Sequence, residues 1–175
     1  EKGGYPENTY TEELKKKGYR VSLWQLPYVA ENAEQIDEAR KNDYIAPLTK
    51  KQDSEGSNFS ALDYAGTIDF TYPKATEWYK GLLKNLLDMG VTCIKTDFGE
   101  NIHMDALYKG MRPELLNNLY ALLYQKAAYE ITKDVTGDGI VWARSAWAGC
   151  QRYPLHWGGD SCSSWDGMAG SLKGG

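Results

Sequence analysis

The first part of the chain passes from a helix-like to a strand-like pattern of apolar and polar residues. Residues 11–18 open with Thr and close with Gly, which is typical of a short capped helix. Residues 19–25 alternate apolar with polar side chains and include Tyr, Val and Trp, which predicts a strand that Pro27 ends. Residues 31–41 are polar and helix-prone, so a second helix is expected there.

Residues 42–70 follow neither pattern and include the polar run of residues 50–57. A connection of this length inside a compact domain is usually a functional loop or a disordered segment. We expect a loop close to a functional site, and a polar linker fits the same stretch about equally well.

Two longer helices are predicted by apolar side chains that recur at three- and four-residue spacing. The first begins at Pro73, a residue favoured in a first helical turn, and closes at Gly90. The second covers residues 113–133. The expected buried sides are Trp78, Tyr79, Leu82, Leu83, Leu86 and Leu87 in the first helix, and Leu115, Leu116, Leu119, Leu122, Leu123, Ala127 and Ile131 in the second.

Further strands are predicted over residues 91–96 and 140–144, with a fourth over residues 153–157 and a last helix from about Ser164 that carries Met168 and Leu172. Strands that alternate with helices in this way are typical of a parallel α/β sheet with right-handed crossovers. An arc of a (β/α)8 barrel and part of a doubly wound sheet both fit. A dinucleotide site is disfavoured because no G-x-G-x-x-G follows a strand. A complete barrel needs about 250 residues, so if the fold is a barrel, residues 1–175 are a fragment of a single domain.

Charge and cysteine usage narrow the class of protein. The net charge is −4 and the basic residues are scattered, so no nucleic-acid partner is expected. No apolar run approaches membrane-spanning length, and no signal peptide opens the chain, although Glu1 is not a natural start and indicates a piece of something longer. The cysteines, Cys93, Cys150 and Cys162, are odd in number and lack C-x-x-C spacing, which favours a reducing, cytoplasmic location.

Candidate chemistry gathers where the predicted strands end. Asp97 follows an apolar strand in the run Cys93-Ile94-Lys95-Thr96-Asp97-Phe98-Gly99-Glu100, and Asp160 ends the run His156-Trp157-Gly158-Gly159-Asp160. Trp24 and Arg144 also fall at strand ends, and the carboxyl ends of parallel strands share one edge. A pair of carboxyl groups about 5–5.5 Å apart is what a retaining glycosidase needs. We therefore predict that Asp97 and Asp160 meet there, although an isolated Asp at a strand end is usually only a surface residue.

The neighbours of Asp97 favour this interpretation. Lys95 lies two residues before Asp97, so both side chains point to the same face and the lysine favours an ionised nucleophile. A buried ion pair without catalytic function is the alternative. Arg144 can anchor carboxylates or sugar hydroxyls through its fork of donors. Asp160 must instead keep a proton, which closeness to Asp97 and to the ring of Trp157 would favour.

Other hydrolytic chemistries are poorly supported. Residues 134–139 resemble the start of a calcium loop, but Ser145 stands where its closing Glu belongs. His103 and His156 share no metal-ligand spacing, and no G-x-S-x-G is present. The six Trp and thirteen Tyr fit either a large core or a cleft whose rings stack on sugars.

Taken together, these motifs resemble glycoside hydrolase family 31. The resemblance is carried by residues 95–100, 143–145 and 156–161, and it continues through Leu23-Trp24-Gln25-Leu26-Pro27-Tyr28-Val29 and residues 69–71, 78–79 and 89–91. The bacterial α-xylosidase and α-glucosidase branch is the most similar. The resemblance implies strands three to six of a (β/α)8 barrel, with their helices, from a retaining, exo-acting α-glycosidase that uses neither a metal nor an organic cofactor.

The resemblance also implies a role for each candidate residue. Asp97 falls on the nucleophile and Asp160 on the acid/base, and the sugar subsite is lined by Trp24, Lys95, Arg144 and Trp157. The expected partners are a glycoside or oligosaccharide and the rest of the parent domain, and a homo-oligomer stays open. Residues 50–66 lack the tryptophan-rich loop of the α-xylosidase branch, so glucose stays open beside xylose.

Two alternatives from other classes remain. A non-catalytic carbohydrate-binding relative would keep the aromatic residues but would not need both Asp97 and Asp160. An open arc of about four strands leaves unpaired edges and uncovered apolar faces. We therefore expect the 175-residue piece on its own to be unstable and inactive.

Overall fold

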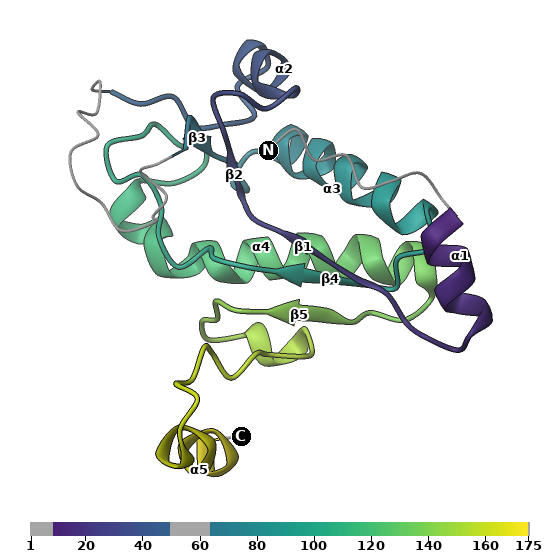
Figure 1. The fold of residues 1–175 in the computed structure, drawn as a ribbon. Helices are drawn as coiled ribbons and strands as arrows, with labels where there is room; N and C mark the ends of the chain where they lie inside the picture. The colour runs from purple at the N-terminus through teal and green to yellow at the C-terminus, as the bar shows by residue number, and fades with distance from the viewer. Residues whose placement is uncertain (1–8, 50–63, 175) are drawn as a thin grey trace.

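A three-stranded parallel sheet forms the centre of the molecule. The computed structural model describes residues 9–49 and 64–174. The sheet has the order β1-β4-β5, with β1 at Ser22–Gln25, β4 at Cys93–Thr96 and β5 at Val141–Ala143. Both pairings are parallel, and the three strands lie side by side in Figure 1. The predicted parallel α/β arrangement is confirmed.

The predicted fourth strand is reduced to a single parallel bridge between His156 and Ala143. The backbone still runs along β5, because Trp157 N–H donates to the carbonyl of Ala143 over 2.8 Å and Leu155 N–H to that of Val141 over 2.6 Å. The strand prediction over residues 153–157 was therefore too strong. Residues 153–157 nevertheless occupy the next place at the edge of the sheet.

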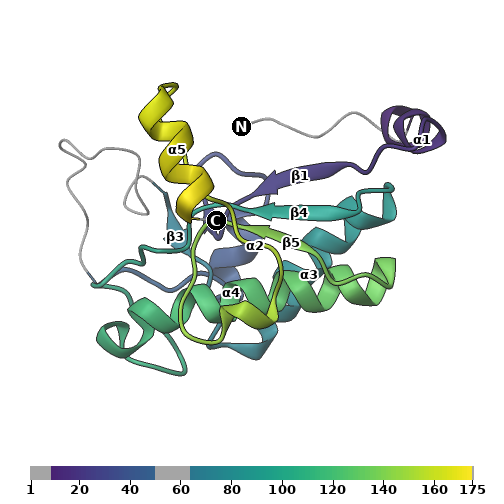
Figure 2. The same cartoon turned by 90° about the horizontal axis from the view of Figure 1, so that it is seen from below.

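Two long helices cover one face of this sheet. α3 spans Pro73–Asp88 and α4 spans Pro113–Thr136, and both helices lie beneath the strands in Figure 2. Each begins with Pro in its first turn, as predicted. The remaining helices are α1 (Thr9–Lys16), α2 (Ile36–Lys41), a 3-10 turn (Cys150–Arg152) and α5 (Trp165–Gly174). α5 lies on the opposite side of the sheet from α3 and α4 (Figure 2).

Strand alternation gives the sheet a covered face and an open face. In β4, Ile94 and Thr96 are fully buried toward the helices, whereas Cys93 and Lys95 are only partly buried. Lys95 pairs in register with Trp24 of β1 and with Trp142 of β5. A row of Trp, Lys and Trp therefore crosses the open face, because residues in register point the same way.

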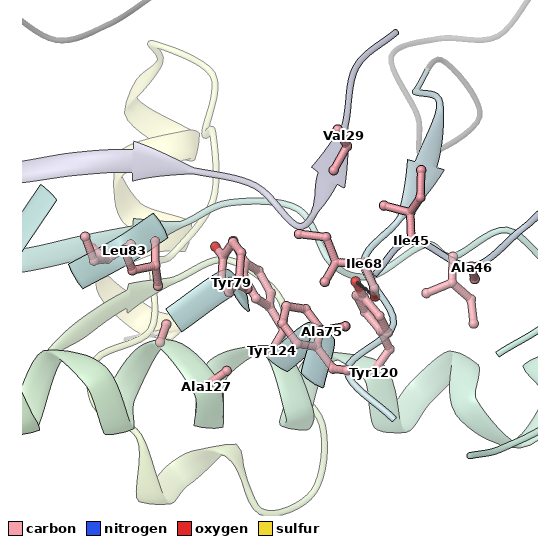
Figure 3. Packing of buried hydrophobic residues seen from close by; sticks show 14 of the residues in the cluster. Val29, Ile45, Ala46, Ile68, Ala75, Tyr79, Leu83, Tyr120, Tyr124 and Ala127 are labelled. Atoms are coloured by element: carbon pink, nitrogen blue, oxygen red, sulfur yellow. Dashed lines mark hydrogen bonds between the residues drawn. The ribbon is translucent and has the colours of Figure 1, made fainter. Parts of the chain in front are cut away.

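Tyrosines, more than leucines, fill the space between the helices and the sheet. Tyr79, Tyr120 and Tyr124 are almost completely buried and lie close together in Figure 3. Leu115, which was predicted to be buried, is 61% exposed. The buried side of α4 includes Tyr120 and Tyr124, whose hydroxyls donate to backbone carbonyls. It consists of Leu116, Tyr120, Ala121, Tyr124, Gln125, Ala127, Ala128 and Thr132.

A short antiparallel ribbon lies beside the main sheet. β2 (Tyr28–Val29) pairs with β3 (Gly66–Thr67), and Ile45 forms a bridge with Ile68. The described residues 42–49 and 64–70 are therefore more regular than the sequence indicated, because two-residue strands are too short to show a period. The predicted loop near a functional site falls largely on residues 50–63, outside the described residues.

Candidate active site

Asp97 lies directly after β4, and donors or cations stand beside both of its carboxylate oxygens. The residue is only 7% exposed. Oδ2 accepts the indole N–H of Trp24 at 2.5 Å, and the Lys95 ammonium lies 3.8 Å away. Oδ1 accepts the backbone N–H of Phe98 at 3.0 Å and faces Nη1 of Arg144 at 3.4 Å. These contacts hold the carboxylate in a fixed orientation.

The topology explains why these groups converge. Trp24 is the register partner of Lys95, and Asp97 N–H continues the ladder to the carbonyl of Gln25 over 2.9 Å. Arg144 follows β5 directly, and its N–H bonds the carbonyl of Thr96 over 3.0 Å. Three adjacent parallel strands thus present their carboxyl-terminal side chains at one edge of the sheet, where α/β enzymes place their sites.

Two tryptophan rings hold the ammonium of Lys95. Lys95 Nζ lies 4.2 Å from the ring centre of Trp157 and 5.4 Å from that of Trp142. Cation–π contacts together with the ion pair to Asp97 offset the cost of partly burying a charge on the open face of the sheet. The predicted Lys95–Asp97 ion pair is present, and Trp157 is brought to it from a segment 62 residues later in the chain, as the two residue numbers show.

Arg144 is shared between two carboxylates. Its Nη2 lies 2.5 Å from Glu100 Oε1, and its Nη1 lies 3.4 Å from Asp97. The guanidinium also stacks over the ring of Phe98, 4.2 Å from the ring centre. Arg144 therefore anchors carboxylates, which was one of its two predicted uses, and Glu100 is the closer partner.

A tight turn connects Asp97 to Glu100. Phe98 has φ of +55° and Gly99 has φ of +90°, so both lie in the left-handed region. A Cβ on Gly99 would lie 2.8 Å from the Tyr124 ring and 2.9 Å from Ser145 Oγ, so glycine is required. The Tyr124 hydroxyl donates to the carbonyl oxygens of Gln25 and Asp97 at 3.2 and 3.3 Å, which ties the turn to the core.

Asp160 lies in the exposed segment between the His156 bridge and α5. Within the described part of the chain, no hydrogen bond or ion pair joins it to Asp97. Trp157, three residues earlier, contacts Lys95, so this segment crosses the open face near the Asp97 site. The role of Asp160 stays a prediction.

Four residues of this site were not singled out from the sequence. Trp142 lies two residues before Arg144 on the same strand, so strand alternation alone was enough to place both on one face. Glu100, Tyr28 and Tyr124 come from a turn, a ribbon strand and a helix, and the Tyr28 hydroxyl accepts the Gly99 N–H of the Asp97 turn at 3.2 Å. No local pattern indicates that their polar atoms meet the Asp97 turn.

One further buried polar group lies in the segment that follows the site. His103 is fully buried, and its Nδ1 lies 2.7 Å from the hydroxyl of Thr67. Burial lowers the pKa of His103, and the charge of Asp105 only partly opposes this. Among residues 9–49 and 64–174, no cluster of three His, Cys, Asp or Glu side chains is arranged to bind a metal ion. Within the same ranges, no helix combines the length and apolarity that a membrane crossing requires.

Comparison with known proteins agrees with the geometry. The whole chain, residues 1–175, matches the model of the glycosyl hydrolases family 31 TIM-barrel domain. The chain belongs to this family of glycoside hydrolases. Its parallel strands and helices are a fragment of that family's (β/α)8 barrel, as the sequence motifs predicted.

Curated relatives include two α-xylosidases. The α-xylosidase of Emericella nidulans is 38% identical over 172 residues, which cover 95% of this chain and 22% of that protein. The α-xylosidase XylQ of Lactiplantibacillus pentosus is 35% identical over 133 residues, which cover 74% of this chain and 17% of that protein. The chain thus spans about a fifth of the length of these relatives.

A solved structure of the same family is also similar. A family 31 sulfoquinovosidase from E. rectale, in complex with an aza-sugar inhibitor, is 29% identical with a TM-score of 0.74. The match covers 88% of this chain and 24% of that one. The cycloalternan-degrading enzyme from Trueperella pyogenes, 24% identical over 99% of this chain and 26% of its own, has a TM-score of 0.82 and supports the fold alone.

Proposed function

We propose that the full-length protein is a retaining, exo-acting α-glycosidase that removes a sugar from the non-reducing end of a glycoside or oligosaccharide. Asp97 attacks the anomeric carbon while Asp160 protonates the leaving oxygen. Asp160 then activates water, which hydrolyses the glycosyl ester on Asp97. Two displacements at one carbon release the sugar with its configuration retained.

The observation that carries this proposal is the setting of Asp97. A nucleophilic carboxylate must be ionised, oriented and close to the substrate. Asp97 is buried, its oxygens meet two N–H donors and two cations, and it lies at the catalytic edge of a parallel sheet. A carboxylate in a structural ion pair needs neither this position nor the exposed aromatic rings around it.

The open face beside Asp97 suits a sugar. Trp24 is 37% exposed and Trp142 is 39% exposed, although both are large apolar side chains. Tryptophan faces pack against the C–H faces of sugars, and Arg144 supplies donors for hydroxyl groups. We assign Trp24, Lys95, Arg144 and Trp157 to the sugar subsite on this basis.

We infer that α-xylosides are the preferred substrates. The two α-xylosidase relatives are 38% and 35% identical to this chain, whereas the sulfoquinovosidase of Escherichia coli is 28% identical over 94% of it and neutral α-glucosidase C of Homo sapiens is 29% identical over 69% of it.

The test uses the full-length protein on three aryl substrates, an α-xyloside, an α-glucoside and an α-sulfoquinovoside. We expect kcat/KM to be highest for the α-xyloside. Asp97→Ala should lose turnover, and azide should restore part of it by forming a β-glycosyl azide. Asp138→Ala is the control, because Asp138 is an exposed aspartate that pairs with Arg20 at 3.4 Å.

A different experimental result would contradict each of these assignments. Normal turnover by Asp97→Ala would reject the nucleophile, and a preference for the α-glucoside would replace xylose with glucose. No hydrolysis of any glycoside by a wild-type protein that still binds oligosaccharides would favour a non-catalytic carbohydrate-binding relative.

A further inference from the structure

The turn after Asp97 needs an external support. Phe98 has φ of +55° although it carries a Cβ, and this region is disfavoured for residues other than glycine. Such conformations persist where the surrounding structure holds them, and they concentrate at functional sites. A side chain from another element must therefore hold this turn.

The hydroxyl of Tyr28 spans the turn. It accepts the backbone N–H of Gly99 at 3.2 Å and donates to the backbone carbonyl of Asn101 at 2.7 Å. Tyr28 comes from β2, 71 residues before Gly99, so a separate element supplies this support. One oxygen atom thus fixes both sides of Glu100.

The ring of Tyr28 is itself firmly placed. Its centre lies 5.2 Å from that of Tyr64 and 6.4 Å from that of Phe98, and the residue is only 6% exposed. Burial raises the pKa of Tyr28 to about 12. The hydroxyl therefore keeps its proton, and its bond to Asn101, throughout the neutral and mildly alkaline range.

The turn carries two groups of the site. Asp97 lies at its start, and Glu100 within it holds Arg144 at 2.5 Å. Arg144 in turn faces Asp97 at 3.4 Å. A shift of the turn would therefore move the carboxylate and the guanidinium relative to each other, without removing either.

We propose that Tyr28 is a positioning residue for the reaction, whose hydroxyl sets the geometry of Asp97 and Arg144 through the turn. The inference rests on the proposed function of Asp97. The β2–β3 ribbon thereby takes part in catalysis through Tyr28, which does not contact the substrate.

The test compares Tyr28→Phe with Tyr120→Phe in the full-length protein. Tyr120, labelled in Figure 3, is a fully buried phenol whose hydroxyl donates to the carbonyls of Ile68 and Pro27 at 2.8 and 3.3 Å instead of to residues of the turn. Both substitutions remove one buried hydroxyl and keep the ring. The melting temperature, kcat and KM are measured on the best aryl glycoside.

We expect the two variants to lose similar melting temperature but to differ in kinetics. Tyr28→Phe should lower kcat about ten- to a hundredfold, because small misplacements of reacting groups are costly. Its KM should change less than its kcat, since the subsite residues Trp24 and Lys95 lie on β1 and β4, outside the turn. Tyr120→Phe should keep both kcat and KM.

Several results would overturn the inference. A normal kcat for Tyr28→Phe, or an equal loss in both variants, would show that its hydroxyl serves stability alone. The same holds if Tyr28→Phe is recovered unfolded while Tyr120→Phe folds. Asp97→Ala distinguishes failure of the proposed function from failure of the role of Tyr28. An active Asp97→Ala rejects the proposed function. An inactive Asp97→Ala together with a normal Tyr28→Phe rejects only the role of Tyr28.

Discussion

The indole N–H of Trp24 donates to Oδ2 of Asp97 over 2.5 Å, across 73 residues of sequence. The bond joins β1 to the end of β4 and gives Asp97 a donor on the side away from the Phe98 amide. A tryptophan that lines the open face therefore also orients the carboxylate. A substitution that keeps an aromatic ring but removes the N–H of Trp24 can separate these two roles.

Trp24→Phe is expected to lower kcat/KM. It keeps an aromatic face but removes the N–H, and a hydrogen bond to a charged group contributes about 1.5–3 kcal/mol. The corresponding loss is about ten- to a hundredfold. Trp78→Phe is the matched control, because Trp78 Nε1 is buried with no hydrogen-bond partner in the described structure. Equal losses in both variants would contradict an orienting role for Trp24.

Lys95→Met is expected to reduce kcat/KM at least about tenfold, because a charge 3.8 Å from Asp97 and two cation–π contacts are lost together. Methionine retains length and fills the space between the rings. Lys80→Met provides the comparison, since Lys80 of α3 pairs with Glu130 of α4 at 2.9 Å and with Glu77 of its own helix at 3.2 Å. Steady-state kinetics should leave Lys80→Met normal, and an unchanged Lys95→Met would show that its charge is dispensable.

The sequence was sufficient for the parallel sheet and for the groups on the ends of its strands. Strand alternation placed Lys95 beside Asp97, and Pro73, Pro113 and Gly90 marked the helix ends. These signals are local, so they can be interpreted without knowing the rest of the molecule.

Contacts between distant elements were not accessible in the same way. Leu115 follows the helical period yet is exposed, because α4 turns its tyrosines toward the sheet. Glu100 and Tyr28 act through bonds that depend on a left-handed turn, which nothing in the residue pattern specifies. The role of Asp160 stays a prediction, because it lies in an exposed segment without a hydrogen bond or ion pair to Asp97 in the described residues.

Gly99→Ala is expected to destabilise the full-length protein more than Gly137→Ala. Both glycines have positive φ, +90° and +77°, so each substitution costs about 1–2 kcal/mol in backbone strain. Only at Gly99 would the new Cβ overlap side chains, at 2.8 and 2.9 Å, which adds about 1–3 kcal/mol. Nothing lies within 4 Å at Gly137. Thermal unfolding measures the difference, and equal melting temperatures would contradict the crowding.

Stability should fall in mild acid because of His103. Burial lowers the pKa of His103 in the folded chain from the ordinary value of 6.5. Just below pH 6.5, His103 is therefore protonated in the unfolded chain but still neutral in the folded chain, which lowers the free energy of unfolding. The contribution of His103 is therefore present above pH 6.5, is lost as the pH falls through the lowered folded pKa, and then levels off. Denaturant unfolding across this range should show that the free energy of unfolding depends less steeply on pH in His103→Gln than in the wild type. Identical slopes would show that His103 does not cause the effect.

The most direct test of the account is to trap the glycosyl ester in the full-length protein. A 5-fluoro-α-glycosyl fluoride of the preferred sugar should inactivate the enzyme, and mass spectrometry of its peptides should find one glycosyl group on Asp97. Asp97→Ala should take up no label. A label on another carboxylate, or hydrolysis without any covalent intermediate, would contradict the assignment of Asp97 as the nucleophile.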